Sequence, residues 1–161
     1  MQIEGSVAND QDHEDWGMFG DYLALGVGWP LNRDVARRDA ILGIVTVADP
    51  AAVTHFRDIG VTRLELLISE GFIALDQATP GTPTPRVFID FMGRFPEARV
   101  HGYAVHPERD DYRITIEGIE CDLSSGHSAA EWSTLRAVFE DRFASATTFY
   151  SESDWLYAWW D

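Results

Sequence analysis

The sequence predicts a single α+β domain with N-terminal helices, a four-stranded antiparallel meander over about residues 72–123, and two C-terminal helices that cover the sheet. Three observations predict this class. Between residues 72 and 123, apolar and polar residues alternate with a period of two, as in strands with one buried face. On both sides of that segment, apolar residues recur every three or four positions, as on a helix. The length of 161 residues suits one domain that buries roughly 70% of the surface exposed by its unfolded chain.

The N-terminal region divides into an acidic segment and the start of the domain. Residues 1–15 are acidic and have no apolar periodicity, so we expect them to be mobile and the globular domain to span residues 16–161. Residues 22–29 (YLALGVGW) fit a strand. Residues 33–47 fit either a helix that runs into a strand or one longer helix, and the pattern leaves both open.

A first helix is predicted after the aspartate and proline at positions 49 and 50. Asp49 suits an N-cap and Pro50 suits the first helical position, where a missing N–H costs nothing. We therefore expect a helix over residues 51–59 that ends at Gly60.

A second helix is predicted over residues 62–70. Thr62 and Glu65 have the spacing of a capping box, in which each side chain satisfies the other residue's backbone N–H. Gly71 follows, and glycine is common just after the end of a helix because it adopts the left-handed conformation without strain.

The predicted meander has four strands, joined by loops of different character. An extended loop rich in threonine and proline occupies residues 77–86, and a charged turn occupies residues 107–111. In the last strand the apolar residues change parity at Gly118, which predicts a bulge or bend there. The strands are expected near residues 72–76, 86–91, 98–106 and 112–123.

Two helices are predicted after the meander. Ser128 and Glu131 form a second capping box, and the apolar residues that follow recur at spacings of three and four. Ser151 and Asp154 have similar spacing. On a helical wheel the aromatic residues of 152–160 gather on one side, so we expect a short amphipathic helix that docks on the protein's own apolar surface rather than an exposed hook for a partner.

Charge is the most unusual global property of the chain. Twenty-seven acidic residues oppose 12 basic ones, every basic residue is an arginine, and the formal net charge is −15. Residues 1–32 hold six acids and no base, and residues 143–161 hold three acids and no base. A charge of this sign repels phosphate backbones and attracts cationic partners, so we expect no nucleic-acid binding.

Cysteine content and hydropathy predict a compartment. The single cysteine, Cys121, excludes an intrachain disulfide and any CxxC pattern, which suits a reducing environment. The N-terminus has no apolar core of a signal peptide, and the chain has no apolar run of about 18 residues. We therefore expect a cytoplasmic protein with no membrane partner.

A helix-turn-helix reader of DNA is an alternative for residues 55–77, where two predicted helices are followed by a predicted hairpin. The segment between Gly60 and Gly71 is too short for a recognition helix and its turn. Arg63 is the sole base on that helix, whereas DNA readers need a basic surface. We therefore set this alternative aside.

The sequence predicts neither a metal site nor a cofactor. The histidines at positions 13, 55, 101, 106 and 127 are scattered, and His101 and His106 would point to opposite faces of one strand. The acidic cluster over residues 12–15 has metal ligands but is expected to be solvated. Cys121 has the parity of buried residues, which argues against a nucleophile. No glycine-rich phosphate loop or nucleophile-elbow motif occurs.

His101 and Glu117 are the candidate catalytic residues. If residues 107–111 form a five-residue turn, His101 pairs opposite Glu117 on the neighbouring strand. A carboxylate beside an imidazole orients it and raises its basicity, as in general acid–base catalysis. The alternative is a structural pair on a solvated sheet face, which we favour, since a slip of one residue separates the two side chains.

The candidate partner-binding residues lie at the C-terminus. All six tryptophans lie near the two ends of the chain, and Trp and Tyr are enriched as anchors of interfaces. The residues expected to bind a partner are Trp155, Tyr157, Trp159 and Trp160.

Two classes of function follow from these patterns. The first is a non-catalytic protein-binding module of the immunity or inhibitor type, whose partner is a cationic protein or a second copy of the chain in a homodimer. The alternative is a small enzyme or small-molecule-binding domain with a pocket between the sheet and its covering helices. We expect the first, without a cofactor.

Overall fold

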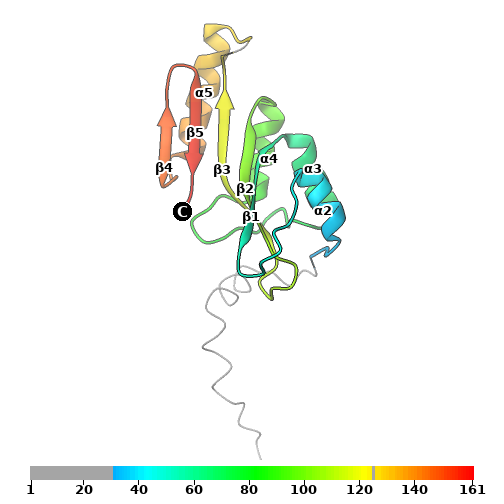
Figure 1. Cartoon of the computed structure of the whole chain (residues 1–161). Helices are drawn as coiled ribbons and strands as arrows, with labels where there is room; N and C mark the ends of the chain where they lie inside the picture. The colour runs from blue at the N-terminus through cyan, green and yellow to red at the C-terminus, as the bar shows by residue number, and fades with distance from the viewer. Residues whose placement is uncertain (1–30, 125) are drawn as a thin grey trace, which may run out of the picture.

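The computed structural model describes residues 31–124 and 126–161 (Figure 1). The predicted mobile segment 1–15 and the predicted strand 22–29 therefore lie outside the described residues. The C-terminal residues lie within the sheet, which brings them beside segments much earlier in the chain (Figure 1).

The described chain forms an antiparallel five-stranded sheet with helices packed against one face, which confirms the α+β class (Figure 1). The strand order in space is β1-β2-β3-β5-β4. The strands are β1 (Val53–Ile59), β2 (Arg99–Val105), β3 (Ile114–Asp122), β4 (Thr148–Ser151) and β5 (Trp155–Trp159). The helices are α2 (Val35–Leu42), α3 (Val61–Ser69), α4 (Pro85–Arg94) and α5 (Ala129–Phe143). In Figure 1, α4 and α5 lie behind the sheet.

The core lies between the sheet and these helices. Alternate residues of the central strands, such as Ile119 and Leu156, are fully buried on this face. Phe139 and Phe143 of α5 meet them from the helical layer, with ring centroids 4.9 Å apart. This face buries most of the apolar surface that stabilises the fold.

The predicted helix after Ser128 is confirmed as α5, and so is its capping box. The Glu131 backbone N–H donates to the Ser128 hydroxyl at 3.3 Å, and the Ser128 backbone N–H donates to Glu131 Oε2 at 2.8 Å. Both otherwise unpaired groups are satisfied, so the helix has a defined start.

The predicted helix over residues 62–70 is confirmed as α3, but its start differs. Gly60 occupies the N-cap and no side chain caps the helix, so the Thr62–Glu65 spacing is not a working capping box. Gly71 adopts φ 79°, as expected just after a helix.

The predicted helix over residues 51–59 is wrong, because this segment is strand β1. Asp49 and Pro50 instead begin a turn, in which the Ala52 N–H donates to the Asp49 carbonyl at 3.1 Å. Phe56 is buried, whereas Arg57 is exposed. The segment therefore follows the period of a strand, and a β-branched residue at Val53 suits it.

Two of the four predicted meander strands are also wrong. Residues 72–76 form turns outside the sheet, and residues 86–91 belong to helix α4. Pro85 lies in the first turn of that helix, and Phe88, Phe91 and Met92 are buried at spacings of three and one. The meander is therefore β1-β2-β3, and its last two strands are the ones predicted at residues 98–106 and 112–123.

The predicted C-terminal helix is wrong, because residues 148–159 form the β4-β5 hairpin. Ser151 does not cap a helix. Its hydroxyl donates to Glu140 Oε1 at 2.6 Å and accepts from Arg136 Nη1 at 2.9 Å, which ties the hairpin to α5. A single helix, α5, rather than two, follows β3 in the described chain.

The predicted irregularity at Gly118 is confirmed. The β2-β3 register shifts between His101, opposite Gly118, and Gly102, opposite Ile116, so Glu117 is the extra residue of a bulge. The bulge changes which side chains of β3 meet those of β2. The charged turn over residues 107–111 is also present between these strands.

Candidate functional site

The face of the sheet opposite the helices carries polar and aromatic side chains. No helix of the described chain lies over this face, which we call the open face (Figure 1). Its residues alternate with those of the core because successive side chains of a strand point to opposite sides. They include His55, Arg57, His101, Tyr103, Glu117, Glu120, Asp122, Tyr150, Trp155, Tyr157 and Trp159.

The register between β3 and β5 places an acid beside each of two aromatic residues. Glu120 lies opposite Tyr157, and Asp122 lies opposite Trp155. Tyr150 of β4 lies opposite Tyr157 on the other side and is 47% exposed. We call these five residues the aromatic–acid strip.

The rings of this strip are in mutual contact. Trp155 and Tyr157 are stacked with centroids 5.2 Å apart, and Tyr150 stacks on Trp155 at 5.9 Å. Stacked neighbours restrict each other's rotamers, so the aromatic surface is largely preorganised. The strip can therefore receive a ligand without a large loss of side-chain entropy.

A pocket of about 300 Å³ lies next to the strip on the open face. We call it the sheet pocket. It is open to solvent and spans β1, β2, β3 and β5, and its side chains are polar, charged or aromatic. The lining residues are His55, Phe56, Arg57, His101, Gly102, Glu117, Glu120, Tyr157 and Trp159.

His101 lines the pocket, and its ring lies over Gly118. A Cβ atom on residue 118 would lie 2.1 Å from His101 Nε2, so only glycine leaves room for the ring. The imidazole stacks on Tyr157 with centroids 5.4 Å apart and an angle of 9° between the planes. Burial, with a further contribution from Arg57, lowers the pKa of His101 to about 4, so the ring is neutral at pH 7.

Glu117 also lines the pocket. Burial raises the pKa of this carboxyl, while His55 and a hydrogen bond from the Trp159 side chain act in the opposite direction. His55 Nδ1 lies 3.8 Å from Glu117 Oε2. The carboxylate is therefore partly desolvated and has one exposed imidazole beside it.

The structure brings His101 and Glu117 to one pocket but not into the predicted pair. His101 pairs with Gly118, because the bulge displaces Glu117 by one position. The imidazole beside Glu117 is His55, which the structure places on β1. The wrong prediction of a helix over residues 51–59 hid this contact. The apolar residues Val53, Phe56 and Ile59 recur every three positions, so the sequence pattern did not indicate a strand there.

The four predicted partner-binding residues separate into two groups. Trp155, Tyr157 and Trp159 lie on the open face, whereas Trp160 is only 5% exposed and packs in the core against Phe88 and Phe143. The structure also brings Tyr150 to the open face, which the sequence pattern did not indicate.

Cys121 and His127 lie in surroundings that suit a structural role. Cys121 is buried in the core, and burial raises the pKa of its thiol well above the usual range. His127 Nε2 lies 3.0 Å from Glu97 Oε1. Within residues 31–124 and 126–161, no three His, Cys, Asp or Glu side chains converge as a metal ion requires. The acidic cluster at 12–15 lies outside the described residues.

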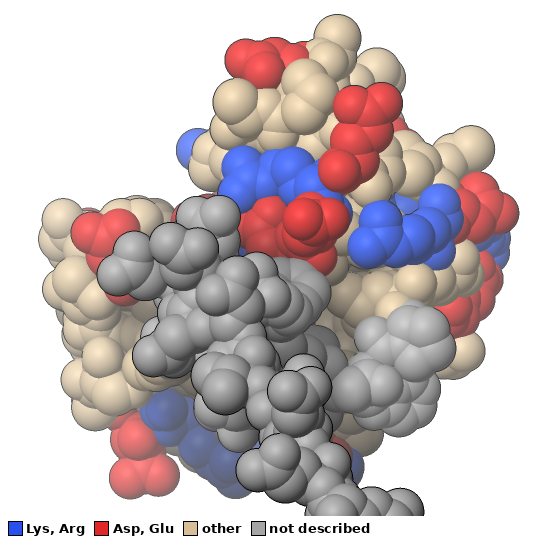
Figure 2. All heavy atoms as spheres, turned by 90° about the horizontal axis from the view of Figure 1, so that it is seen from below, with Lys and Arg blue, Asp and Glu red and all other residues tan. Residues whose placement is uncertain are grey.

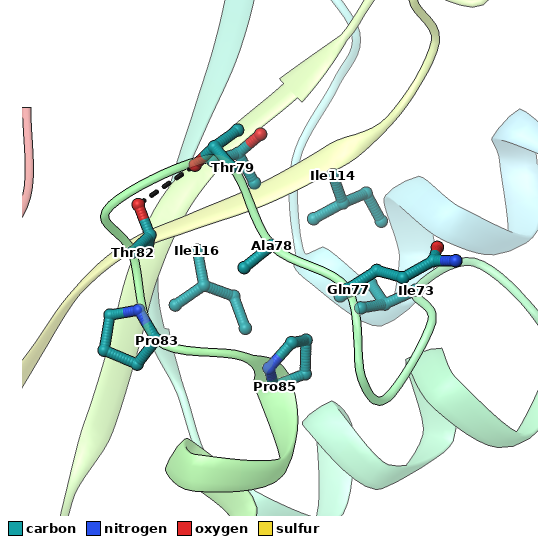
Figure 3. A pocket seen from close by; sticks show the side chains of 10 residues that line it. Ile73, Gln77, Ala78, Thr79, Thr82, Pro83, Pro85, Ile114 and Ile116 are labelled. Carbon is teal, nitrogen blue, oxygen red and sulfur yellow. Dashed lines mark hydrogen bonds between the residues drawn. The ribbon is translucent and has the colours of Figure 1, made fainter. Parts of the chain in front are cut away.

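A second, much smaller pocket lies between the sheet and the loop that precedes α4 (Figure 3). Ile114 and Ile116 of β3 face Pro83 and Pro85 across it. Its volume is about 20 Å³, which is room for about one water molecule. The sheet pocket is therefore the larger of these two.

Seen from below, arginine and acidic side chains adjoin each other on the described surface (Figure 2). Ion pairs join some arginine and acidic side chains of the described chain. Asp111 accepts from Arg109 at 2.7 Å within the 107–111 turn and from Arg113, just after the turn, at 2.8 Å. These arginines are therefore compensated locally.

Comparison with protein-family models, curated proteins and solved structures finds no match to this chain. Among the described residues, no helix is both long enough and apolar enough to cross a membrane. The geometry of the open face is therefore the basis for a functional proposal.

Proposed function

We propose that the protein is a non-catalytic protein-binding module of the immunity or inhibitor type, whose open sheet face docks on a cationic surface of a partner protein. The observation that carries this proposal is the β3-β5 register, which places Glu120 beside Tyr157 and Asp122 beside Trp155. A lysine or arginine that reaches this strip would meet a carboxylate and an aromatic ring together. Each such cation–π contact contributes about 0.5–1 kcal/mol at an exposed site.

Long-range charge supports the same partner class. The net charge of −15 accelerates encounter with a cationic protein and makes the rate of association depend on salt. A second copy of the chain fits less well, since two strips in contact would bring Glu120 and Asp122 close to their own copies. The compartment proposed with this function is the cytoplasm, which suits a chain with one buried cysteine.

A second candidate function is a small enzyme or a small-molecule-binding domain. The sheet pocket favours it, because its volume of about 300 Å³ is at the lower end for ligand sites. The pocket lies on the open face rather than between sheet and helices. We place catalysis second, because His101 pairs with glycine and the imidazole beside Glu117 is 64% exposed.

A cationic peptide tests the proposed function. The full chain is titrated with a fluorescent peptide of alternating arginine and glycine, and compared with the Glu120→Gln/Asp122→Asn variant. Two charge contacts near the surface contribute about 0.2–1 kcal/mol each, so we expect binding to be about twofold weaker at least and roughly thirtyfold weaker at most.

The matched control is Glu65→Gln/Asp141→Asn, which removes the same two charges from exposed positions on helices α3 and α5. We expect this control to bind nearly as the wild type does. Equal weakening in both variants would mean that only net charge matters, and the strip would then not be the docking surface.

A further inference from the structure

We propose that the sheet pocket receives one arginine side chain of the cationic partner, with its guanidinium between the carboxylates of Glu117 and Glu120 and against the rings of Tyr157 and Trp159. This inference rests on the proposed function and names the group that the partner must present. It adds a specific anchor to a surface that would otherwise recognise charge alone.

The charge of the pocket favours a cation. Two carboxylates, Glu117 and Glu120, line it, against one arginine, Arg57, which is exposed. His101 adds no positive charge at pH 7, because burial lowers its pKa to about 4. The groups closest to a ligand therefore favour a cation over an anion.

The shape of the pocket favours a planar group. His101 and Tyr157 are stacked with 9° between their planes, so parallel aromatic rings line the pocket. Trp159 lines the same pocket. Arginine stacks on aromatic faces through its planar guanidinium, whereas the compact ammonium of lysine is more strongly hydrated and does not stack in this way.

Glu117 has the hydrogen-bonding capacity that a guanidinium needs. An ionised carboxylate accepts about four hydrogen bonds. Within the described chain, Glu117 accepts one from the Trp159 side chain and has His55 Nδ1 at 3.8 Å from Oε2. A guanidinium fork can supply two parallel donors to one carboxylate. The partly desolvated Glu117 would gain more from this contact than an exposed carboxylate would.

Two features of β3 shape the pocket. Gly118 has no side chain, so the imidazole of His101 can lie over it, and a Cβ there would also lie 2.9 Å from the Ala158 carbonyl oxygen. The bulge at Glu117 turns its carboxylate toward β1, where it lies near His55 rather than opposite His101. The backbone of β3 therefore helps to set where the side chains of His101 and Glu117 lie in the pocket.

Arg57 allows a test in which two substitutions should change the affinity for arginine in opposite directions. As the like charge at this pocket, it opposes a bound guanidinium. Removing Arg57 should strengthen binding, whereas removing the charge of Glu117 should weaken it. A pocket that bound an anion would show the reverse pattern.

The experiment uses the full ¹⁵N-labelled chain and N-acetyl-arginine amide as the probe. The indole N–H signal of Trp159 reports on the pocket, and that of Trp132 on α5 is the internal control. N-acetyl-citrulline amide has nearly the same shape without the charge, and N-acetyl-lysine amide has the charge without a planar guanidinium. We expect saturable shifts of the Trp159 signal with arginine, weaker ones with lysine and none with citrulline.

Substitutions in the pocket then test the sign of the charge that it binds. We expect Glu117→Gln to weaken arginine binding about fivefold or more and Arg57→Gln to strengthen it about twofold. Equal shifts with citrulline, or an unchanged affinity in both variants, would overturn the proposal. Arg57→Gln keeps the test decisive if Glu117→Gln does not fold.

A peptide measurement separates this inference from the proposed function. In the arginine–glycine peptide assay, Glu117→Gln should weaken binding beyond the effect of Glu65→Gln. If the strip variant weakens peptide binding and Glu117→Gln does not, the pocket is not the anchor although the docking surface stands. If neither variant affects the peptide but the capped arginine still binds in the pocket, the site serves a small molecule and both proposals fail.

Discussion

The two faces of the same five strands differ in almost every physical property. On the face that packs against the helices, which we call the closed face, Ile119, Leu156 and Ala158 are fully buried. On the open face, their neighbours Glu120 and Tyr157 remain in contact with solvent. Because side chains alternate along a strand, residues one position apart serve stability on one face and recognition on the other. Paired substitutions can test how complete this separation is.

The largest expected effect comes from the closed face. Phe143 is fully buried and its ring lies 4.9 to 5.9 Å from those of Phe139, Phe91, Phe88 and Trp160. We expect Phe143→Ala to lower the free energy of unfolding by about 3–5 kcal/mol, because it leaves a cavity in the core. Urea denaturation followed by tryptophan fluorescence or circular dichroism measures this loss.

The matched substitution on the open face is Trp155→Ala. This residue is partly exposed and stacks on Tyr157. We expect a loss of roughly 1 kcal/mol, since an aromatic pair contributes about 0.5–1.5 kcal/mol beyond area burial. A loss as large as that of Phe143→Ala would show that the open face is part of the core and would argue against its role in docking.

An intermediate effect is expected at Gly118, where the backbone of β3 lies close both to the His101 ring and to the backbone of β5. Gly118→Ala would place a Cβ 2.1 Å from His101 Nε2 and 2.9 Å from the Ala158 carbonyl oxygen. We expect a loss of about 1–3 kcal/mol, as for other overpacked sites. The double variant Gly118→Ala/His101→Ala should recover part of this loss, because it removes the clash with the imidazole. The recovery should be incomplete, because the close contact with the Ala158 carbonyl oxygen remains. No recovery would mean that the ring does not lie over the glycine.

The smallest expected effect is a dependence of stability on pH through His101. The unfolded imidazole takes up a proton near pH 6.5, whereas the folded one does so only near pH 4. Between these values the unfolded state binds more protons, so stability falls as the pH is lowered from 6.5 toward 4. We expect His101→Asn to reduce this decline when denaturation curves at pH 7.5 and 5.5 are compared.

A second substitution helps to identify the source of that pH effect. Glu117→Gln removes a carboxyl whose pKa is raised in the folded state. Because the folded state binds this proton more readily than the unfolded state does, Glu117 favours folding as the pH falls, which is opposite to the effect of His101. An unchanged decline in His101→Asn would contradict the buried, neutral imidazole.

The sequence predicted the α+β class, both strands around the 107–111 turn and the helix after Ser128, because each has a regular period and a local end signal. Its largest error concerned residues 155–160. There, apolar residues at Leu156, Trp159 and Trp160 fit a helical spacing, while Leu156, Ala158 and Trp160 fit a strand. Short apolar segments are ambiguous by period alone, and the pairing partner in β3 decides the outcome.

The candidate site was predicted in its residues but not in its geometry. His101 and Glu117 both line the sheet pocket, and three of the four C-terminal aromatic residues lie on the open face. The bulge determines which imidazole meets Glu117, and a shift of one residue changes that pairing. Such a shift depends on backbone geometry across two strands, which the local pattern around Gly118 indicates but does not quantify.

The strand order has a consequence for folding during synthesis. The β1-β2-β3 meander precedes α5 and the β4-β5 hairpin in the chain, yet β5 pairs directly with β3. Until the hairpin has been made, the edge of β3 has no partner among the described strands and can pair with another chain. The time that passes before the hairpin is made and docks on β3 therefore sets how long this edge is open to aggregation. Substitutions that weaken β4 or β5 should lower the yield of folded protein even where they change its free energy of unfolding little.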